Sequence, residues 1–183
     1  ERAYARFDNE RLARRLRDDA KGTQLWPAAV ESVQAEGDSL LVHLSDGRVR
    51  KTDYVVDCSG AGSSLVRREE GPPPAVQTAM GRVIRPASSG GAMDVPVLMD
   101  YRPVERSGPA SFGYVLPFAD GTMLVEETVL AARPAVAPED LRPRLERRLE
   151  QYGLQDAEVV DTERVAIPMG APLPMAEEPV VPF

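Results

Sequence analysis

The stretch GYVLPFADGTMLVEETVL, residues 113–130, decides how the second half of the chain folds. Its two apolar runs are separated by Ala119-Asp120-Gly121, a tripeptide typical of a turn between antiparallel strands. Four strand-like runs follow one another in this half, at residues 77–85, 95–102, 112–118 and 122–131. The short spacing between these runs predicts an antiparallel sheet.

Two neighbouring glutamates, Glu126 and Glu127, lie inside the second of the two apolar runs. Burying an ionised carboxylate is costly, so such a group usually has a partner or a raised pKa. Side chains alternate along a strand, which sends the two carboxylates to opposite, mostly apolar faces. Either each glutamate pairs with an arginine, or one is a carboxylic acid that donates a proton near neutral pH. The residues alone leave both possibilities open.

The first part of the chain has a different pattern. Apolar residues at helical spacing predict a helix within residues 1–22, with Asn9 as its N-cap. Residues 23–60 predict a small β-meander that turns at Asp46-Gly47, followed by a buried strand at Tyr54–Cys58. This order of elements is typical of a crossover back into a parallel sheet.

The breaker cluster EEGPPPA, residues 69–75, predicts a boundary between two domains. Further on, residues 138–152 predict an amphipathic helix and residues 157–168 a last strand. We therefore expect an α/β (α+β) fold. Residues 1–70 would hold the helix, the meander and the returning strand, and residues 71–183 an antiparallel sheet with one helix.

The composition excludes several classes of protein. A net charge of −7 without a basic stripe argues against a nucleic-acid partner. No apolar run approaches the roughly 20 residues of a membrane-spanning helix. Cys58 is the only cysteine, so no intrachain disulfide can form and a reducing cytoplasm is the expected location. The chain lacks an initiator methionine and stops on EEPVVPF, so we expect a fragment of a longer protein.

Several polar residues are candidates for chemistry. His43 is the only histidine, which makes a Ser-His-Asp triad or a histidine-rich metal site hard to build, and we expect no metal. Its place in a hairpin strand predicts a solvent-facing side chain. Asp100 and Arg102 share one face of a strand, where they form either a structural ion pair or part of a site.

Small residues follow the predicted buried strand, in the order Cys58-Ser59-Gly60-Ala61-Gly62. A small buried residue at a strand end explains the cysteine without any reactivity. Small residues at this place also let a ligand approach the backbone closely. A GxGxxG sequence after a first strand, the usual dinucleotide signature, is absent.

Several segments together resemble one family, the flavin-dependent lycopene cyclases. LVEET resembles the family's FLEET motif, and MDYR and FGYVLPF resemble the two strands before it. IPMGAPLP resembles its IPMGG-x-LP segment, QTAMG its YQTAYG strand, and VVDCSG the D-A-T-G strand end of many FAD-binding enzymes. These motifs stand in the family's order and span most of residues 54–174. Cys58 and Ser59 depart from the usual Ala and Thr, and Ala171 replaces a glycine.

The resemblance implies the reaction and its acid. Lycopene cyclases convert linear ψ-ends to β- or ε-ionone rings without net redox, through protonation of a terminal double bond. Glu126, the first glutamate of LVEET, would be the essential acid/base. Glu127 would face away and anchor the strand through an arginine or a backbone contact. Asp100 and Arg102 would orient the site.

The resemblance also implies the cofactor. The family uses FAD in its reduced form, with NAD(P)H as the reductant, and the electron-rich flavin would stabilise a cationic transition state. Residues 1–70 would then be part of a Rossmann-like FAD-binding domain, and residues 71–183 the substrate domain. Cys58, Ser59 and Gly60 would contact the cofactor, and Val30 would lie near the adenine.

The implied substrate is lycopene, which dissolves in the bilayer, so we expect a cytoplasmic protein that touches the membrane surface. Two alternatives remain. One is another FAD-dependent enzyme of the same superfamily, a monooxygenase or a prenyl reductase. The other is a non-catalytic fragment that binds nothing.

Overall fold

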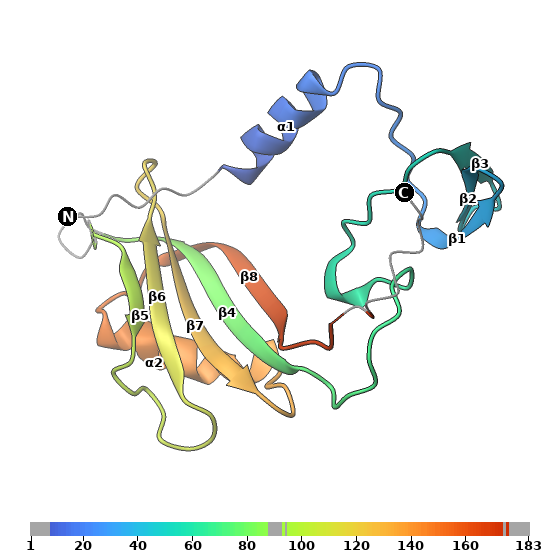
Figure 1. The fold of residues 1–183 in the computed structure, drawn as a ribbon. Helices are drawn as coiled ribbons and strands as arrows, with labels where there is room; N and C mark the ends of the chain where they lie inside the picture. The colour runs from blue at the N-terminus through green and yellow to red at the C-terminus, as the bar shows by residue number, and fades with distance from the viewer. Residues whose placement is uncertain (1–7, 88–92, 94, 174, 176–183) are drawn as a thin grey trace. The chain divides into compact units, whose positions relative to one another are not determined.

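The computed structural model describes residues 8–87, 93, 95–173 and 175, and this part of the chain divides into two compact units (Figure 1). The first unit contains the described residues up to Glu69 together with Leu173 and Met175, and the second runs from Glu70 to Pro172. Each unit has its own sheet.

The first unit begins with α1, Asn9–Asp19, which confirms the predicted helix. Its N-cap is Asp8 rather than Asn9, because an oxygen of the Asp8 carboxylate accepts a hydrogen bond of 2.9 Å from the Arg11 amide. A three-stranded antiparallel sheet follows, in the order β1 (Val30–Glu36), β2 (Ser39–Leu44) and β3 (Val49–Thr52).

The predicted turn at Asp46-Gly47 is confirmed. It joins β2 to β3, and Gly47 has a φ of +81°, a backbone conformation that favours glycine. The Asp46 carboxylate accepts a hydrogen bond of 3.1 Å from the Arg48 amide. The expectation for His43 is wrong, because its side chain is partly buried and its Nε2 has no partner among the described residues.

The predicted buried strand at Tyr54–Cys58 is wrong. The segment pairs with no strand in the described residues, and Tyr54 and Val56 are 72% and 84% exposed. The burial expected for Cys58 is also wrong, because this residue is exposed. An apolar run becomes a buried strand only where neighbouring strands pair with its backbone, and every ladder among the described residues is antiparallel. A single turn of 3₁₀ helix, η1 at Gly60–Gly62, follows instead.

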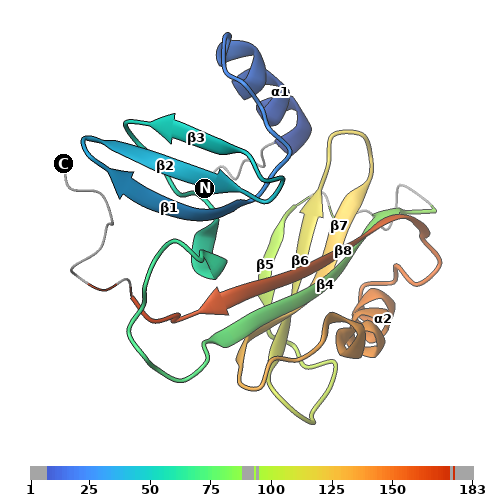
Figure 2. The same cartoon turned by 90° about the vertical axis from the view of Figure 1, so that its right-hand side faces the viewer.

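The second unit is built on the predicted antiparallel sheet (Figure 2). Its strands are β4 (Ala75–Arg85), β5 (Val97–Asp100), β6 (Ser111–Pro117), β7 (Met123–Ala132) and β8 (Glu158–Met169). They are arranged in the order β5-β6-β7-β4-β8, so β5 and β8 form the edges. All four runs quoted for this half, and the last strand, are thereby confirmed.

One helix packs against the second sheet. A 3₁₀ turn, η2 at Pro138–Leu141, leads into α2, Arg142–Gln151. Pro143 lies in the first turn of α2, where its missing N–H has no intrahelical partner to lose. Because α2 covers one face of the sheet (Figure 2), the core of the unit lies between them. Its buried residues include Met80, Ile84, Val115, Met123, Val125, Val129, Leu141, Leu145 and Leu149.

Candidate active site

The two glutamates of β7 lie on opposite faces of the sheet. Glu127 pairs in register with Gly113 of β6 and Met80 of β4, and Met80 belongs to the core under α2. Glu126 pairs with Tyr114 and Gly81, one residue further along each ladder. The ladder is regular here, so the alternation expected from the sequence places Glu127 toward α2 and Glu126 away from it.

Glu127 is completely buried and ionically paired. Arg148 of α2 donates from Nε to Glu127 Oε2 at 2.8 Å and from Nη2 to Oε1 at 3.3 Å. The Ser111 hydroxyl donates to Oε1 at 2.6 Å. Both Glu127 and Arg148 are 0% exposed, so the charges compensate each other away from water. The arginine contact expected for Glu127 is therefore present.

Asp100 and Arg102 join this same network. The side chain of Arg102 donates to both oxygens of the Asp100 carboxylate, the shortest contact being 2.6 Å from Nη2 to Oδ2. Tyr152 of α2 donates to Asp100 Oδ2 at 2.8 Å, and Arg148 Nη1 lies 3.6 Å from the same oxygen. The hydrogen bond from Arg102 is the main cause that holds the pKa of Asp100 well below its usual range. Burial and the Asp100 contact raise the pKa of Tyr152 to about 12.

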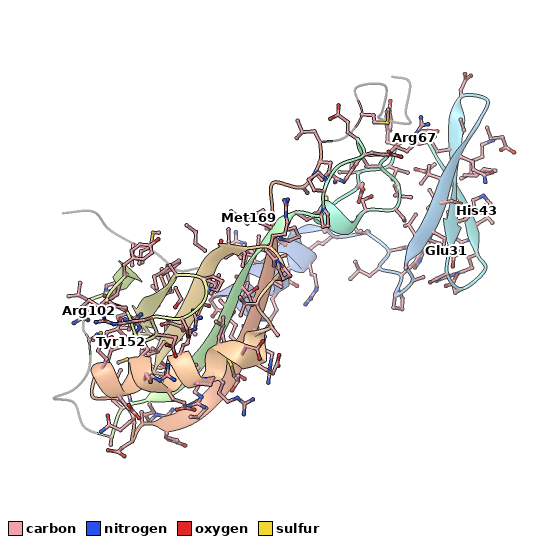
Figure 3. The ribbon with its side chains drawn as sticks, turned by 90° about the horizontal axis from the view of Figure 1, so that it is seen from below. Glu31, His43, Arg67, Arg102, Tyr152 and Met169 are labelled. Carbon is pink, nitrogen blue, oxygen red and sulfur yellow. The ribbon has the colours of Figure 1, made fainter. Side chains whose placement is uncertain are left out.

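The register places the Asp100 network on the α2 face. Asp100 is the partner of Gly113, which in turn is the partner of Glu127. Figure 3 shows Arg102 and Tyr152 close together, and the Arg102 guanidinium carbon lies 5.8 Å from the Tyr152 ring centre. The structure thus brings Asp100 and Arg102 together with Glu127, and it separates all three from Glu126 by the thickness of the sheet.

Gly113 makes this arrangement possible. A Cβ at this position would stand 2.7 Å from the Tyr152 hydroxyl and 2.8 Å from Arg148 Nε. Only a residue without a side chain therefore lets the guanidinium and the phenol cross β6 between Asp100 and Glu127.

Glu126 has a different environment on the other face. Its side chain is partly buried, and the Thr128 hydroxyl donates to its Oε1 at 2.6 Å. Its surroundings on this face include the buried apolar residues Ala79, Phe112, Leu116 and Leu124. Burial, and to a lesser extent the charge of Glu163, raise the pKa of Glu126 against the opposing effect of the Thr128 hydrogen bond. Within the described residues Glu126 forms no ion pair. It can therefore act as a proton donor.

The first unit contains a cleft at the predicted cofactor residues. The cleft has a volume of about 420 Å³, and three of the four predicted residues, Val30, Cys58 and Ser59, line it. Gly60 follows directly, with a φ of +78° and nothing within 4 Å of the place a Cβ would occupy. The other lining residues are Ala29, Val55, Val56, Asp57, Gly62, Ser64 and Leu65.

Asp57 organises the loop beside this cleft. Its carboxylate accepts from the Ser59 amide at 2.9 Å, from the Ser59 hydroxyl at 2.5 Å and from the Ser63 hydroxyl. These hydrogen bonds, led by that of the Ser59 hydroxyl, lower the pKa of Asp57 to about 2. The cleft combines apolar walls, small residues and a carboxylate, so its residues suit an apolar ring with attached hydroxyl groups.

The sequence reasoning missed Arg148 and Asp57. Arg148 stands three residues after Leu145 and one before Leu149, so it interrupts the apolar face of α2. A charged residue on an apolar helix face could have indicated a buried partner. Asp57 ends an apolar run just before the small residues, where a lone carboxylate was the signal.

The described residues were compared with what a metal site and a membrane-spanning helix require. Within the described ranges, no three His, Cys, Asp or Glu side chains converge as metal ligands would. None of the helices in the part of the chain that the structure describes has the length and apolar character that a membrane crossing requires.

Comparison with known proteins identifies relatives along the whole chain. The model of the family described as "Lycopene cyclase protein" matches residues 1–183. A lycopene beta cyclase, chloroplastic, of an Oncidium hybrid cultivar is 30% identical over 98% of this chain and 41% of its own length. An uncharacterized carotenoid cyclase of Deinococcus radiodurans is 38% identical over 93% of this chain and 42% of its own length. The chain thus spans about two fifths of the length of these relatives.

Among solved structures, the Diels-Alderase PyrE3 of the pyrroindomycin biosynthetic pathway has a similar fold. The TM-score is 0.54 at 21% sequence identity, and the match covers 85% of this chain and 34% of that chain. This similarity shows a related fold and nothing about the reaction.

Proposed function

The chain belongs to the lycopene cyclase family, and from this premise we propose that it carries the acid that closes the ionone rings of a carotene such as lycopene. The observation that supports this best is the environment of Glu126. A carboxyl group with a raised pKa, among apolar side chains and without an ion-pair partner in the described residues, is suited to protonating an alkene.

The proposed reaction is an isomerisation without net redox, and so belongs to the intramolecular lyases. Glu126 gives its proton to the terminal C1=C2 double bond of the linear end. The C5=C6 bond attacks the resulting tertiary cation, and loss of a proton completes the ring. Phe112, Leu116 and Leu124 line the face around the acid and would exclude the water that quenches a cation.

The cofactor proposed for this chemistry is FAD. The cleft in the first unit fits part of it, with Val30 and Leu65 as apolar walls and Cys58, Ser59 and Gly60 where the backbone can approach a ligand closely. When bound in its reduced form, with NAD(P)H as reductant, the flavin would supply electron density against the positive charge of the transition state.

The remaining predicted residues take indirect roles in this proposal. Glu127, Asp100 and Arg102 lie on the α2 face, so they would act by fixing β7 and β5 rather than by touching the substrate. We also propose peripheral contact with the cytoplasmic side of a membrane, because the substrate is apolar.

The test is cyclisation of lycopene in liposomes by the complete protein with reduced FAD, followed by chromatography of the pigments. We expect ring products without stoichiometric consumption of NAD(P)H, and their loss in Glu126→Gln. Rings that survive in Glu126→Gln would show that another group is the acid. Consumption of NAD(P)H in step with product would instead support the monooxygenase or prenyl reductase alternative. The inert-fragment alternative is tested on the 183-residue chain itself, which under that alternative would bind no FAD in a flavin-fluorescence titration.

A further inference from the structure

A second carboxylate lies in the same cross-strand row as Glu126. Gly81 of β4 is the register partner of Glu126 on β7 and also of Glu163 on β8. Directly opposed residues of neighbouring strands project to the same face, so both carboxylates stand on the face turned away from α2. Two strand spacings separate their Cα atoms by about 10 Å.

The position between the two carboxylates has an apolar floor. A Cβ at Gly81 would stand 2.9 Å from the Leu124 Cδ1 and 3.4 Å from the Glu126 Cβ. Gly81 is buried, and the Leu124 methyl stands where a side chain of Gly81 would be. An apolar group between Glu126 and Glu163 would therefore rest on the Leu124 side chain and would meet no polar side chain of β4 in this row.

The two carboxyl groups have opposite surroundings. Glu126 is partly buried, and burial is the main cause of its raised pKa. Glu163 is exposed on β8, which is an edge strand. Pairs of carboxyl groups with such contrasting environments divide the roles of acid and base in other enzymes.

Few other charged or titratable groups share this face in the described part of the sheet. Tyr114 of β6 stands beside Glu126, and Asp161 of β8 lies opposite Val83, one row away. Tyr101 contacts Phe112 on this face, with the two ring centres 5.3 Å apart. The Arg85–Glu158 ion pair closes the end of β4. Among these groups, Glu163 is the carboxylate that faces Glu126 across a residue without a side chain.

We propose that Glu163 is a second catalytic residue, the base that takes the proton released on ring closure while the reacting carotene end rests on the Leu124 side chain between Glu126 and Glu163. The inference rests on the function proposed above and deepens it, because the resemblance gives Glu126 both the acid and the base role, whereas this inference assigns the base role to Glu163.

The step balances without any oxidant. The Glu126 carboxyl gives its proton to C2, and the positive charge appears on C1. The π pair of C5=C6 forms the C1–C6 bond, which moves the charge to C5. The C–H pair at C6 becomes the C5=C6 bond of the ring, and the proton goes to the Glu163 carboxylate. Glu163, which is exposed, returns a proton to water, and Glu126 regains one, so each cycle adds one proton and removes one.

The experiment compares Glu163→Gln with Asp161→Asn in the complete, FAD-loaded protein, using lycopene in liposomes from mildly acid to mildly alkaline pH. For the wild type we expect the rate to fall toward alkaline pH, as the carboxyl group of Glu126 with its raised pKa loses its proton. Glu163→Gln should lower kcat by about 10²-fold with little change in KM, as expected for loss of a general base. Asp161→Asn removes a charge from the same face of the same strand and should keep the wild-type kcat. Glu163→Asp, which keeps a carboxylate, should recover part of the lost kcat.

Two results would overturn the assignment while leaving the proposed function intact: a Glu163→Gln variant that keeps the wild-type kcat, or an equal loss of kcat in Asp161→Asn. A wild-type protein that forms no rings would overturn the proposed function, and this inference with it.

Discussion

Replacing Arg148 with methionine should destabilise the second unit severely. Arg148 is 0% exposed and donates to Glu127, to the Arg102 carbonyl at 2.8 Å and to Gln151 at 2.8 Å. Methionine fills a similar volume and removes the charge, so the variant isolates the loss of the guanidinium from the creation of a cavity.

The magnitude follows from what remains behind. In Arg148→Met the carboxylate of Glu127, also 0% exposed, keeps only the Ser111 hydroxyl at 2.6 Å as a side-chain donor. Removing one partner of a buried pair costs about 3–5 kcal/mol, because the other charge stays buried and uncompensated. The double variant Glu127→Gln/Arg148→Met removes both charges and should recover about half of that loss or more.

The assay is urea unfolding followed by circular dichroism, with Arg147→Met as the matched control. Arg147 is the preceding residue of α2, and its 2.6 Å ion pair with Glu105 is exposed to water, so its loss should matter far less. The reasoning is refuted if Arg148→Met and Arg147→Met unfold at the same urea concentration. It is also refuted if the double variant is no more stable than Arg148→Met.

Two further predictions concern other sites. Gly113→Ala should lower the free energy of unfolding by about 1–3 kcal/mol, because its Cβ would stand 2.7 Å from the Tyr152 hydroxyl, whereas Gly62→Ala has nothing within 4 Å and should be nearly neutral in the same urea assay. Asp57→Asn should weaken FAD binding, measured by quenching of flavin fluorescence, because it loosens the loop beside the cleft. The folded-state pKa of Asp57 is lowered to about 2. The stabilisation by its carboxylate is therefore fully present above the ordinary carboxyl pKa and is lost as the pH falls from there through the folded-state pKa. The difference in stability between wild type and Asp57→Asn should therefore shrink on acidification, and a constant difference would contradict this account.

The sequence predicted the second unit well because its signals are local. Alternation along β7 and the Gly121 turn, with a φ of +82°, identify a hairpin without reference to the rest of the fold. The same period of two separates Glu126 from Glu127. The partner of Glu127 was not predictable, because α2 carries four arginines and their sequence spacing does not show which one reaches β7.

The strand predicted at Tyr54–Cys58 did not form, and the face of the sheet on which Asp100 lies was not predicted, for the same reason. Both features depend on how a segment pairs with other strands. Whether Val56 is buried is decided by the presence of neighbouring strands, and within the described residues none pairs with it. Asp100 lies on the Glu127 face because β5 pairs with β6 at Gly113, a register that no single strand reveals.

The pairing of Glu127 with Arg148 also explains how the neighbouring glutamate keeps its acidity. A one-residue slip of β7 would exchange the faces of the two glutamates and bring Glu126 to Arg148. A carboxylate paired with a buried guanidinium accepts hydrogen bonds and has no proton to give. The buried ion pair on the α2 face therefore favours the register in which Glu126 faces apolar side chains and, among the described residues, no cation. If Glu126 is the acid proposed above, LVEET needs both glutamates, one to hold the strand in register and the other to carry the proton.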